Sequence, residues 1–572
     1  MSQRVTPLGN ACVTGFVRAQ GREIVNGEGS PFLLRGVGLG SWLLPEGYMW
    51  RMPEGADRPR RIEALVRKVV GPAEAERFWH SYWDRFVTES DVERIAWEGF
   101  NSIRLPINAR YLTGSDDSSE MIEERLQRID RFIRWCRAHR LYVVLDLHGA
   151  PGGQTGTNID DSPADRPDLF IEKANQERTV SIWRTLAERY KDEWIIAGYD
   201  LLNEPLPEWF SQYNDQVMPL YRRITEAIRE VDTRHMIVLE GAHWATDWSI
   251  FTEMFDDNVL LQFHKYWNNP DRESIAPYLD ARERLNVPIY MGEGGENNVD
   301  WYAGAFRLYE DLDISWNFWT WKKLDTTNSP ASIPLPAGWG ELASYAESGA
   351  KWDDASPPEG ARAALYEFLD SVALERCHYH EAVVNSLFRR PPVRIPAIFY
   401  AFDGHGVGFG TSTGTRGGTP RIDYRRGDGT TFGYVAADPP RRGAPNFHHN
   451  SGEPWEPEEW LYLLLEPGSW AAYDFAVPPT DADAYQIGLQ LATAGAAGSA
   501  GSADPDAAAV LLTIDSPRQE LSVPVGSLGP DFSIYWIDAR AEPGLRRATV
   551  QCTGATLRLE AVYVRMADTG GD

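Results

Sequence analysis

The sequence predicts an α/β protein in two parts, a (β/α)8 TIM barrel followed by an antiparallel β-sandwich. Between residues 31 and 390, short apolar runs alternate with amphipathic stretches of helical period, as in a barrel of parallel strands. Beyond residue 390, turns rich in Gly and Pro separate short strands of alternating polarity. A chain of 572 residues also exceeds one ordinary domain. We therefore expect an N-terminal arm at 1–30, a barrel at 31–390 and a sandwich at 391–572.

Eight strand candidates supply the predicted barrel. The first lies within Phe32–Gly40, and the others are Asn101–Leu105, Leu141–Leu147, Ile195–Leu202, Met236–Leu239, Val259–Phe263, Pro288–Met291 and Ile314–Phe318. Helical stretches between them include Met121–Ala138, Asn175–Tyr190, Met218–Glu230 and Trp301–Leu312. A doubly wound sheet is the alternative, but no Gly-rich phosphate loop follows the first strand.

Other stretches complete the expected organisation. Residues Glu74–Phe86 predict an inserted helix, and Ser90 is expected to cap the next helix, with Glu93 completing a capping box. Helices at Ala361–Leu374 and Glu381–Phe388 are expected to close the barrel region. The sandwich strands are expected at Trp460–Leu465, Tyr485–Ala494, Ala507–Ile514, Ile534–Asp538 and Thr556–Arg565.

Composition excludes several classes of function. A net charge of −27 argues against a nucleic-acid partner, because phosphate binding needs clustered Lys and Arg. The four cysteines are scattered and form no metal-ligand spacing and no disulfide framework, so we expect no metal and no organic cofactor. The first residues contain no long apolar stretch of the kind found in signal peptides and membrane spans. We therefore expect a cytoplasmic protein without a membrane partner, or a secreted one if a leader has been trimmed.

Two carboxylates mark the predicted site. Glu204 and Glu293 each stand where a strand-like apolar run stops and a loop begins. In a barrel, this is the face on which the loops build active sites. Either glutamate alone would be better interpreted as a structural ion-pair partner. Together they fit the two carboxylates that break a glycosidic bond.

Residues from about 30 to 325 resemble glycoside hydrolase family 5, whose barrels carry catalytic glutamates after strands four and seven. Asn203-Glu204-Pro205 matches the acid/base motif of that family, and Gly292-Glu293 matches its nucleophile motif. Further matches follow in order along the chain at Arg104, His148, His264, Tyr266 and either Trp319 or Trp321. Each of these alone is as readily a structural or core residue. Their order at successive strand ends favours the functional interpretation.

The resemblance implies a retaining mechanism with Glu204 as acid/base and Glu293 as nucleophile. Arg104 and Tyr266 are expected to lower the pKa of Glu293. Glu204 has to arrive protonated, which the nearby charge of Glu293 and partial desolvation would favour. Asn203 is expected to bond the sugar 2-hydroxyl. The remaining positions are expected to bind hydroxyls, orient the carboxylates or stack on the sugar: His148, His264, Trp319 and Trp321.

Two motifs narrow the resemblance to the exo-acting β-1,3-glucanase branch of the family. They are Gly36–Leu43 followed by Glu46, and Asp146–Gln154. In that branch a glutamate after strand one holds the terminal sugar, which nominates Glu46. Bulky side chains near it would close the cleft beyond the first sugar: Trp42, Tyr48 and Trp50.

The C-terminal region weakly resembles jelly-roll carbohydrate-binding modules of the family 6 and 35 type. Gly468-Ser469-Trp470 is similar to their Gly-Glu-Trp strand, but Ser469 replaces the glutamate and the acidic opening motif is missing. A structural role is therefore favoured over glycan binding for this domain.

The combined prediction is a retaining β-glycoside hydrolase whose partner is a carbohydrate substrate. It is expected to act from the end of a β-glucoside or a small β-glucan oligosaccharide. The alternatives are an endo-β-glucanase or transglycosylase, and a non-catalytic glycan-binding protein. Gly294 stands where the family often has an aromatic residue, so the sugar stays open.

Overall fold

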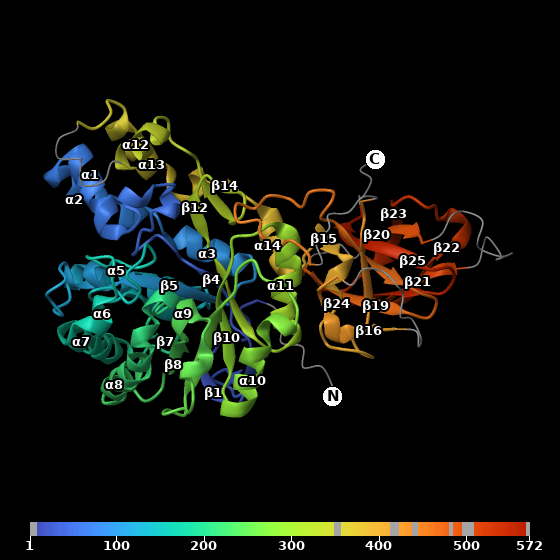
Figure 1. The fold of residues 1–572 in the computed structure, drawn as a ribbon, viewed down its shortest axis with the longest axis horizontal. Coiled ribbons are helices and arrows are strands. Elements are labelled where there is room, and N and C mark those ends of the chain that lie inside the picture. Colours follow the sequence, from blue (N-terminus) through green and yellow to red (C-terminus); the bar gives the residue numbers. More distant parts are fainter. Residues whose placement is uncertain are drawn as a thin grey trace.

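The computed structural model describes residues 9–347, 356–411, 422–436, 444–479, 484–494 and 508–567. Its first domain is a closed barrel of parallel strands, in which each strand pairs with the next and the last pairs with the first (Figure 1). The strands are β4 (Arg35–Gly38), β5 (Ser102–Asn108), β6 (Tyr142–Gly149), β7 (Ile196–Asp200), β8 (Met236–Glu240), β9 (Val259–His264), β10 (Ile289–Gly295) and β11 (Ser315–Trp319). These positions confirm the predicted barrel and its eight predicted strands.

Helices cover the outside of the barrel, so its parallel strands are buried on both faces and can be almost continuously apolar. They are α3 (Glu89–Trp97), α5 (Glu123–Ala138), α7 (Lys173–Tyr190), α8 (Val217–Arg229), α10 (Ala276–Leu285) and α11 (Val299–Asp311). The short helices α4 (Ala109–Thr113), α6 (Asp168–Ile171) and α9 (Ala242–Ala245) lie in the segments that follow β5, β6 and β8. The capping box of α3 is formed by Thr88 and Asp91, so the predicted cap at Ser90 and Glu93 was wrong by two residues. Among the described residues, no helix combines the length and the apolar character that crossing a membrane requires.

The predicted N-terminal arm is largely folded. Strands β1 (Arg18–Gln20), β2 (Glu23–Val25) and β3 (Pro31–Phe32) form a small antiparallel sheet. The hydroxyl of Tyr142, the first residue of β6, donates to the carbonyl oxygen of Thr14 at 2.9 Å. This segment therefore packs on the end of the barrel where the strands begin.

An additional group of helices packs beside the first strand. Helices α1 (Pro59–Val70) and α2 (Pro72–Arg85) contact α13 (Ala361–Ser371), which in turn contacts α12 (Trp339–Glu347); α12 and α13 come from the far end of the barrel sequence (Figure 1). Trp50 lies at the centre of this group, with its ring 4.4 Å from that of Phe368. The predicted inserted helix corresponds to α2, whereas α1 was not predicted.

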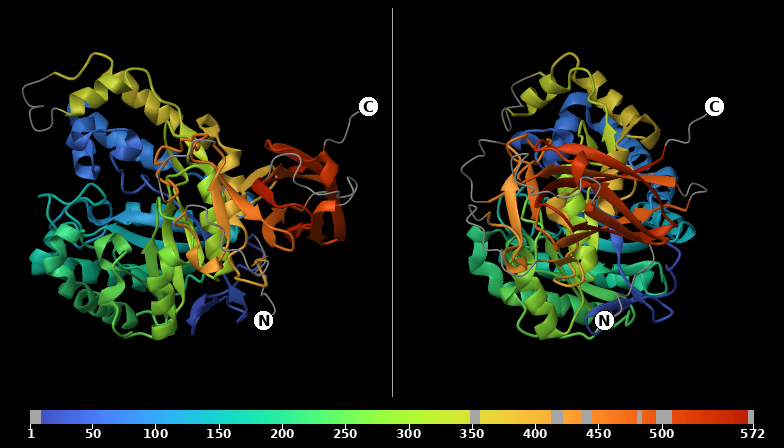
Figure 2. Two further views of the ribbon diagram at one scale, coloured as in Figure 1. Left: turned by 45° about the vertical axis from the view of Figure 1, so that its right-hand side comes forward. Right: turned by 90° about the vertical axis from the view of Figure 1, so that its right-hand side faces the viewer.

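The second domain consists of two antiparallel sheets, as predicted for a β-sandwich (Figure 2). One sheet contains β15 (Val393–Pro396), β17 (Thr431–Tyr434), β18 (Leu461–Leu465), β20 (Ala484–Thr493), β23 (Ser533–Arg540) and β25 (Leu557–Met566). The other contains β16 (Phe409–Gly410), β19 (Trp470–Val477), β21 (Ala508–Asp515), β22 (Arg518–Pro524) and β24 (Gly544–Cys552). Helix α14 (Glu381–Phe388) leads into it, and a small sheet of β12 (Lys322–Leu324), β13 (Ala331–Ile333) and β14 (His378–Tyr379) lies beside the barrel.

Helix α11 is one part of the barrel against which the sandwich packs. A Cβ atom at Gly304 would lie 2.6 Å from the ring of Phe399, so only glycine lets this ring approach the helix so closely. Arg389, which follows α14, is buried and donates to the carbonyl oxygens of Ala303 and Phe399, both at 2.7 Å. These contacts leave no free linker between the two domains at this point.

Buried charges reinforce the same contact. Arg307 of α11 pairs with Asp311 and, at 3.2 Å, with Asp474 of β19. Arg547 of β24 pairs with Asp474 at 2.7 Å and with Asp403 at 2.6 Å. We call these five residues the interface cluster. Each of its acids faces a guanidinium, the arrangement that makes buried carboxylates tolerable.

Candidate active site

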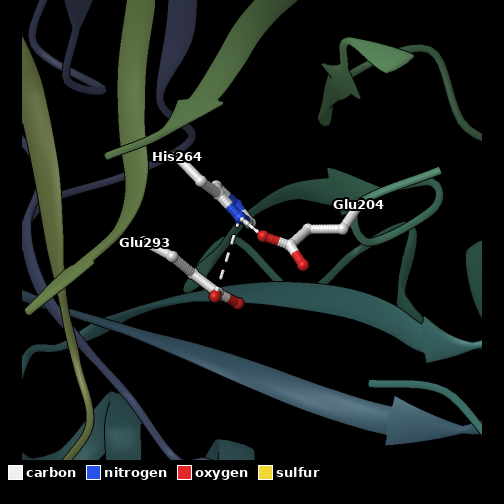
Figure 3. A group of neighbouring side chains, drawn as sticks. All are labelled: Glu204, His264 and Glu293. Carbon is white, nitrogen blue, oxygen red and sulfur yellow. Dashed lines mark hydrogen bonds and ion pairs between the residues drawn. The ribbon is translucent and has the colours of Figure 1, made fainter. Parts of the chain in front are cut away.

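Glu204 and Glu293 lie together at the carboxyl end of the barrel strands. Glu204 lies just beyond β7, and Glu293 lies within β10. One oxygen of each carboxylate and one nitrogen of His264 all lie within 4.8 Å of one another (Figure 3). The structure thus brings together two residues that are far apart in the sequence, with a histidine between them.

His264, at the end of β9, connects the two carboxylates. Its Nδ1 lies 2.7 Å from Glu204 Oε1 and 3.6 Å from Glu293 Oε2, and its Nε2 lies 3.5 Å from Glu240 Oε1. Burial alone would lower the pKa of His264, but the charges of Glu240 and Glu293 raise it well above its usual value. The protonated form of His264, which can donate to these carboxylates, is therefore favoured.

Glu293 is buried and receives two donors. Arg104 Nη1 donates to Oε1, and the Tyr266 hydroxyl donates to Oε2 at 2.9 Å. Burial raises the pKa of Glu293, and although His264 and Arg104 act to lower it, the net shift is upward. The predicted lowering of this pKa was therefore wrong, because the cost of desolvating the carboxylate exceeds the effect of its donors.

Arg104, fully buried, lies beneath Glu293. Its guanidinium contacts Asp200 at 2.9 Å, Glu240 at 3.0 Å and Asp146 at 3.1 Å. It also donates to Asn203 Oδ1 at 2.9 Å. We call its four carboxylate partners the catalytic-centre acids: Asp146, Asp200, Glu240 and Glu293. Burial raises the pKa of Asp146 to about 8 and that of Asp200 well above its usual value.

Glu240 and Gln262 belong to this network and were not predicted. Glu240 is the last residue of β8, and Gln262 Nε2 donates to its Oε1 at 2.5 Å. Gln262 precedes His264 by two residues on β9, so both side chains lie on the same face of the strand. A polar residue inside an apolar strand, in register with a candidate site residue, was the available signal.

The backbone at Glu204 is strained. Glu204 has φ 45° and Leu206 has φ 57°, in the left-handed region that non-glycine residues rarely adopt. The N–H of Glu204 donates to Glu240 Oε2 at 2.7 Å. Glu240 therefore supports the acid/base candidate through the backbone, while His264 orients the carboxylate itself.

A layer of rings lies beside the two carboxylates. The rings of His148 and Trp319 are parallel with centroids 5.5 Å apart, and Trp319 Nε1 donates to the Tyr48 hydroxyl at 2.8 Å. His148 Nδ1 lies 2.7 Å from Asp146 Oδ2, and its Nε2 lies 3.3 Å from Asn203 Nδ2. Burial lowers the pKa of His148 to about 4, so this imidazole is neutral at pH 7.

Glu46 lies close enough to Glu204 and Glu293 for their charges to raise its pKa. It is 2% exposed, and its Oε1 has no hydrogen-bond partner among the described residues. Burial, followed by the charges of Glu293 and Glu296, raises the pKa of Glu46 well above its usual value. A buried carboxyl oxygen without a partner is available to a ligand hydroxyl.

Three of the tryptophans considered in the sequence lie elsewhere. Trp321 is buried with its Nε1 donating to Asp91 at 3.0 Å, so the alternative assignment of the sugar platform to this residue was wrong. Trp42 and Trp50 are each 1% exposed and pack in the core against α2, so they do not close the cleft. Of the bulky group near Glu46, Tyr48 is the one that contacts Trp319.

Within the part of the chain that the structure describes, two groups of side chains offer ligand atoms close enough to hold a cation: Glu204 with His264 and Glu293, and Asp311 with Asp403 and Asp474. In the first group, the imidazolium of His264 already supplies a positive charge between the carboxylates. In the second, the guanidinium groups of the interface cluster do so. Neither group needs a metal ion to account for its geometry.

Comparisons with known proteins show which family this chain resembles. The model of the cellulase family, glycosyl hydrolase family 5, matches residues 68–325. A β-xylosidase of Phanerodontia chrysosporium is 33% identical over 345 residues, covering 54% of this chain and 71% of the relative. A probable glucan 1,3-β-glucosidase A of Emericella nidulans is 31% identical over 277 residues, covering 46% of this chain and 66% of the relative. A solved endogalactoceramidase aligns with TM-score 0.45 and 15% identity, covering 96% of this chain and 99% of that one.

Proposed function

The chain belongs to glycosyl hydrolase family 5, and we propose that it is a retaining β-glycosidase that removes terminal sugars from β-glucosides or short β-glucan oligosaccharides. Membership of the family makes it a glycoside hydrolase that acts on O-glycosyl bonds. The stereochemical course, the terminal mode of attack and the sugar are the proposal.

The observation that supports a retaining course is the closeness of the two carboxylates. Their nearest oxygens lie within 4.8 Å. Retaining glycosidases hold their carboxyl groups about 5–5.5 Å apart, whereas inverting enzymes leave about 6.5–9.5 Å for a water molecule. The gap between Glu204 and Glu293 fits direct attack on the sugar.

The proposed reaction has two steps. Glu293 attacks the anomeric carbon while Glu204 protonates the departing oxygen, which gives a covalent glycosyl-enzyme and a free leaving group. Glu204, now a carboxylate, then takes a proton from water, and the water oxygen displaces Glu293. Tyr266 and Arg104 hold the attacking carboxylate in place, and His264 holds Glu204.

Attack at the end of the substrate is supported by Glu46. Its unpartnered buried oxygen can accept hydrogen bonds from the hydroxyls of a terminal sugar. The names of two relatives, a β-xylosidase and a probable glucan 1,3-β-glucosidase, agree with this mode. We propose glucose as the terminal sugar because of the motif around Glu46, and we expect xylosides to be the strongest competitors.

The experiment is hydrolysis of 4-nitrophenyl β-glucoside, β-xyloside and β-galactoside and of laminaritriose, followed by NMR and by product sizing. We expect the β-glucoside to be cleaved with highest kcat/KM, the first-formed sugar to be the β-anomer, and laminaritriose to give glucose and laminaribiose. An α-anomer at early times would overturn the retaining course. From longer β-1,3-glucans, an early ladder of intermediate sizes would indicate an endo-acting enzyme, and longer products would indicate a transglycosylase. Binding of laminaritriose without cleavage of any substrate would indicate a glycan-binding protein.

A further inference from the structure

A loop of the sandwich domain contacts the catalytic face of the barrel. The loop covers residues 446–453, between β17 and β18. The carbonyl oxygen of Phe447 accepts from Asn297 Nδ2 at 2.7 Å, and that of Glu453 accepts from Asn298 Nδ2 at 2.9 Å. We call residues 446–453 the contact loop.

These contacts hold the segment that directly follows the nucleophile strand. Asn297 lies four residues after Glu293 and is fully buried. Asn298 caps α11, with its Oδ1 accepting from Trp301 N at 3.0 Å. Because both amides also donate to the contact loop, the sandwich domain fixes the chain on the C-terminal side of Glu293.

The contact loop also reaches the segment after β12. Asn328 Nδ2 donates to the carbonyl oxygen of Asn450 at 2.9 Å, and Thr327 Oγ1 donates to that of Ser451 at 3.1 Å. Gly452 has φ 84°, and a Cβ atom there would lie 2.9 Å from Asn328 Cβ and Thr327 Oγ1. The close fit at Gly452 fixes the position of the contact loop over the barrel.

A second segment of the sandwich holds the loop after β9, which carries Tyr266. The Tyr424 hydroxyl donates to the carbonyl oxygen of Pro270 at 2.9 Å, and Gly427 N donates to Glu273 Oε1 at 2.9 Å. The loop that carries Tyr266 and the segment that follows Glu293 are thus both held by the second domain.

A row of side chains leads from the nucleophile to the contact loop. Tyr266 donates to Glu293, and its ring centroid lies 5.6 Å from that of Trp267. The ring of Trp267 lies 6.4 Å from that of His448, in the contact loop. Along this row the side chains change from buried at Glu293 to half-buried at Tyr266 and Trp267 and exposed at His448. The row therefore extends from Glu293 to the surface of the protein.

We propose that the sandwich domain completes the active site, with His448 contacting the part of the substrate that extends away from the two carboxylates. An indole face beside an imidazole suits a pyranose ring, which offers C–H groups to the face and hydroxyls to the ring nitrogens. Asn297 is a positioning residue that acts on Glu293 through the chain. The proposal rests on the proposed function for its substrate class, a β-glucan oligosaccharide.

The test measures binding and turnover separately in the full-length protein. Glu293→Gln, which should bind without turning over, is titrated with laminaritriose, alone and combined with His448→Ala or His405→Ala. His405 is the matched control, an exposed histidine of the same domain whose ring packs on Phe409. Loss of one hydrogen bond and a ring contact predicts about three- to tenfold weaker binding for His448→Ala and no change for His405→Ala.

Turnover tests the positioning role. In the otherwise wild-type protein, Asn297→Ala is expected to lower kcat about tenfold on both laminaritriose and 4-nitrophenyl β-glucoside, with KM changed less than threefold. His448→Ala is expected to raise KM for laminaritriose about three- to tenfold and to leave kcat for the aryl glucoside within twofold.

Several outcomes would overturn the inference. If His448→Ala leaves the affinity for laminaritriose unchanged, His448 does not contact the substrate. If no variant binds laminaritriose, the proposed contact is contradicted as well. An unchanged kcat in Asn297→Ala removes the positioning role. If affinity falls with His448→Ala but the wild type hydrolyses nothing, the proposed function fails and the binding role of the contact loop stands.

Discussion

The catalytic-centre acids and the interface cluster are both buried groups of carboxylates, and they differ in their counter-charges. At the interface, Arg307 and Arg547 face Asp311, Asp403 and Asp474. In the barrel, the single guanidinium of Arg104 serves Asp146, Asp200, Glu240 and Glu293, with the imidazolium of His264 beside them. At the catalytic centre four acids share two basic groups, whereas at the interface three acids share two.

The balance of acids and bases separates a structural acidic cluster from a functional one. Paired charges at the interface hold two domains together and need nothing further. Unbalanced charges at the catalytic centre leave carboxyl groups protonated or unpartnered, as at Asp146 and Glu46. Such groups are poised to exchange protons or to bind hydroxyls, so the excess of acid is the mark of function.

Removing the sandwich domain is expected to have the largest effect, because it removes the partners of the barrel at the interface cluster. A chain ending at residue 392 exposes the apolar side of α11 and leaves Arg307 without Asp474. We expect insoluble or unfolded protein, measured by soluble yield and circular dichroism. A soluble, fully active barrel that binds a glycan less tightly would instead show that the sandwich is a separate binding module.

Arg389→Met in the full chain tests the same contact without truncation. The substitution removes the hydrogen bonds that the Arg389 guanidinium donates to the carbonyl oxygens of Ala303 and Phe399, each worth about 1–3 kcal/mol. We expect unfolding in urea to show a loss of about 2–5 kcal/mol. Arg390→Met, at a partly exposed neighbour, is the comparison and should cost less.

Removing one carboxylate from each cluster should have opposite effects. Glu293→Ala is expected to lower kcat/KM on the order of 10⁴-fold or more with little loss of stability, because nothing replaces the nucleophile. Asp403→Asn should leave kcat/KM within about twofold and lower stability by about 1–2 kcal/mol, because it breaks the pair with Arg547. Loss of activity in Asp403→Asn would mean that the interface takes part in catalysis.

Glu204→Ala sharpens the assignment within the catalytic centre. On substrates whose leaving group needs no proton, its first step should remain fast, whereas Glu293→Ala stays inactive. Added azide should restore turnover of Glu204→Ala by forming a β-glycosyl azide, detected by NMR. Formation of the α-azide, or rescue of Glu293→Ala alone, would exchange the roles of the two residues.

The two clusters should also respond differently to pH. Burial raises the pKa of Asp146 to about 8 and that of Asp311 to about 6. A carboxyl group with a raised folded-state pKa contributes stability that is complete below its unfolded pKa, about 4, and is lost as pH rises through its folded value. Wild-type stability is therefore expected to fall as pH rises from about 4 to 8. In thermal melts across this range, Asp146→Asn should make the melting temperature less dependent on pH up to pH 8. Asp311→Asn should do so only up to pH 6. If the melting temperature of Asp146→Asn falls with pH as steeply as that of the wild type, the raised pKa of Asp146 is contradicted.

The smallest expected effect concerns Glu46. Glu46→Gln keeps the shape of the side chain but changes the hydrogen bonds that its head group can make, so KM for a β-glucoside should rise about two- to tenfold, as for loss of one hydrogen bond to a neutral group. Steady-state kinetics measures this, with Glu54→Gln, an exposed acid nearby, as the control. An unchanged KM would leave Glu46 as a buried structural acid.

The sequence predicted the strands and the two central glutamates because both depend on local pattern. Apolar runs ending in polar residues locate strands and their carboxyl ends, and a barrel places those ends together. It could not tell which tryptophans face the cleft, since Trp319 and Trp321 lie two residues apart and differ only after the chain turns beyond β11. Contacts such as that of Asn297 with Phe447 join residues 150 positions apart and leave no local pattern.

The missing side chain at Gly304 has a consequence for the origin of this architecture. Phe399 occupies the volume that any larger residue on α11 would need. With alanine at this position, the barrel could not pack against this sandwich without a shift of Phe399. If another domain replaced the sandwich, the surface of α11 at Gly304 would be left without a side chain to fill it. The two domains are therefore poor candidates for shuffling, and we expect homologous chains to inherit glycine and aromatic ring together or to lose both.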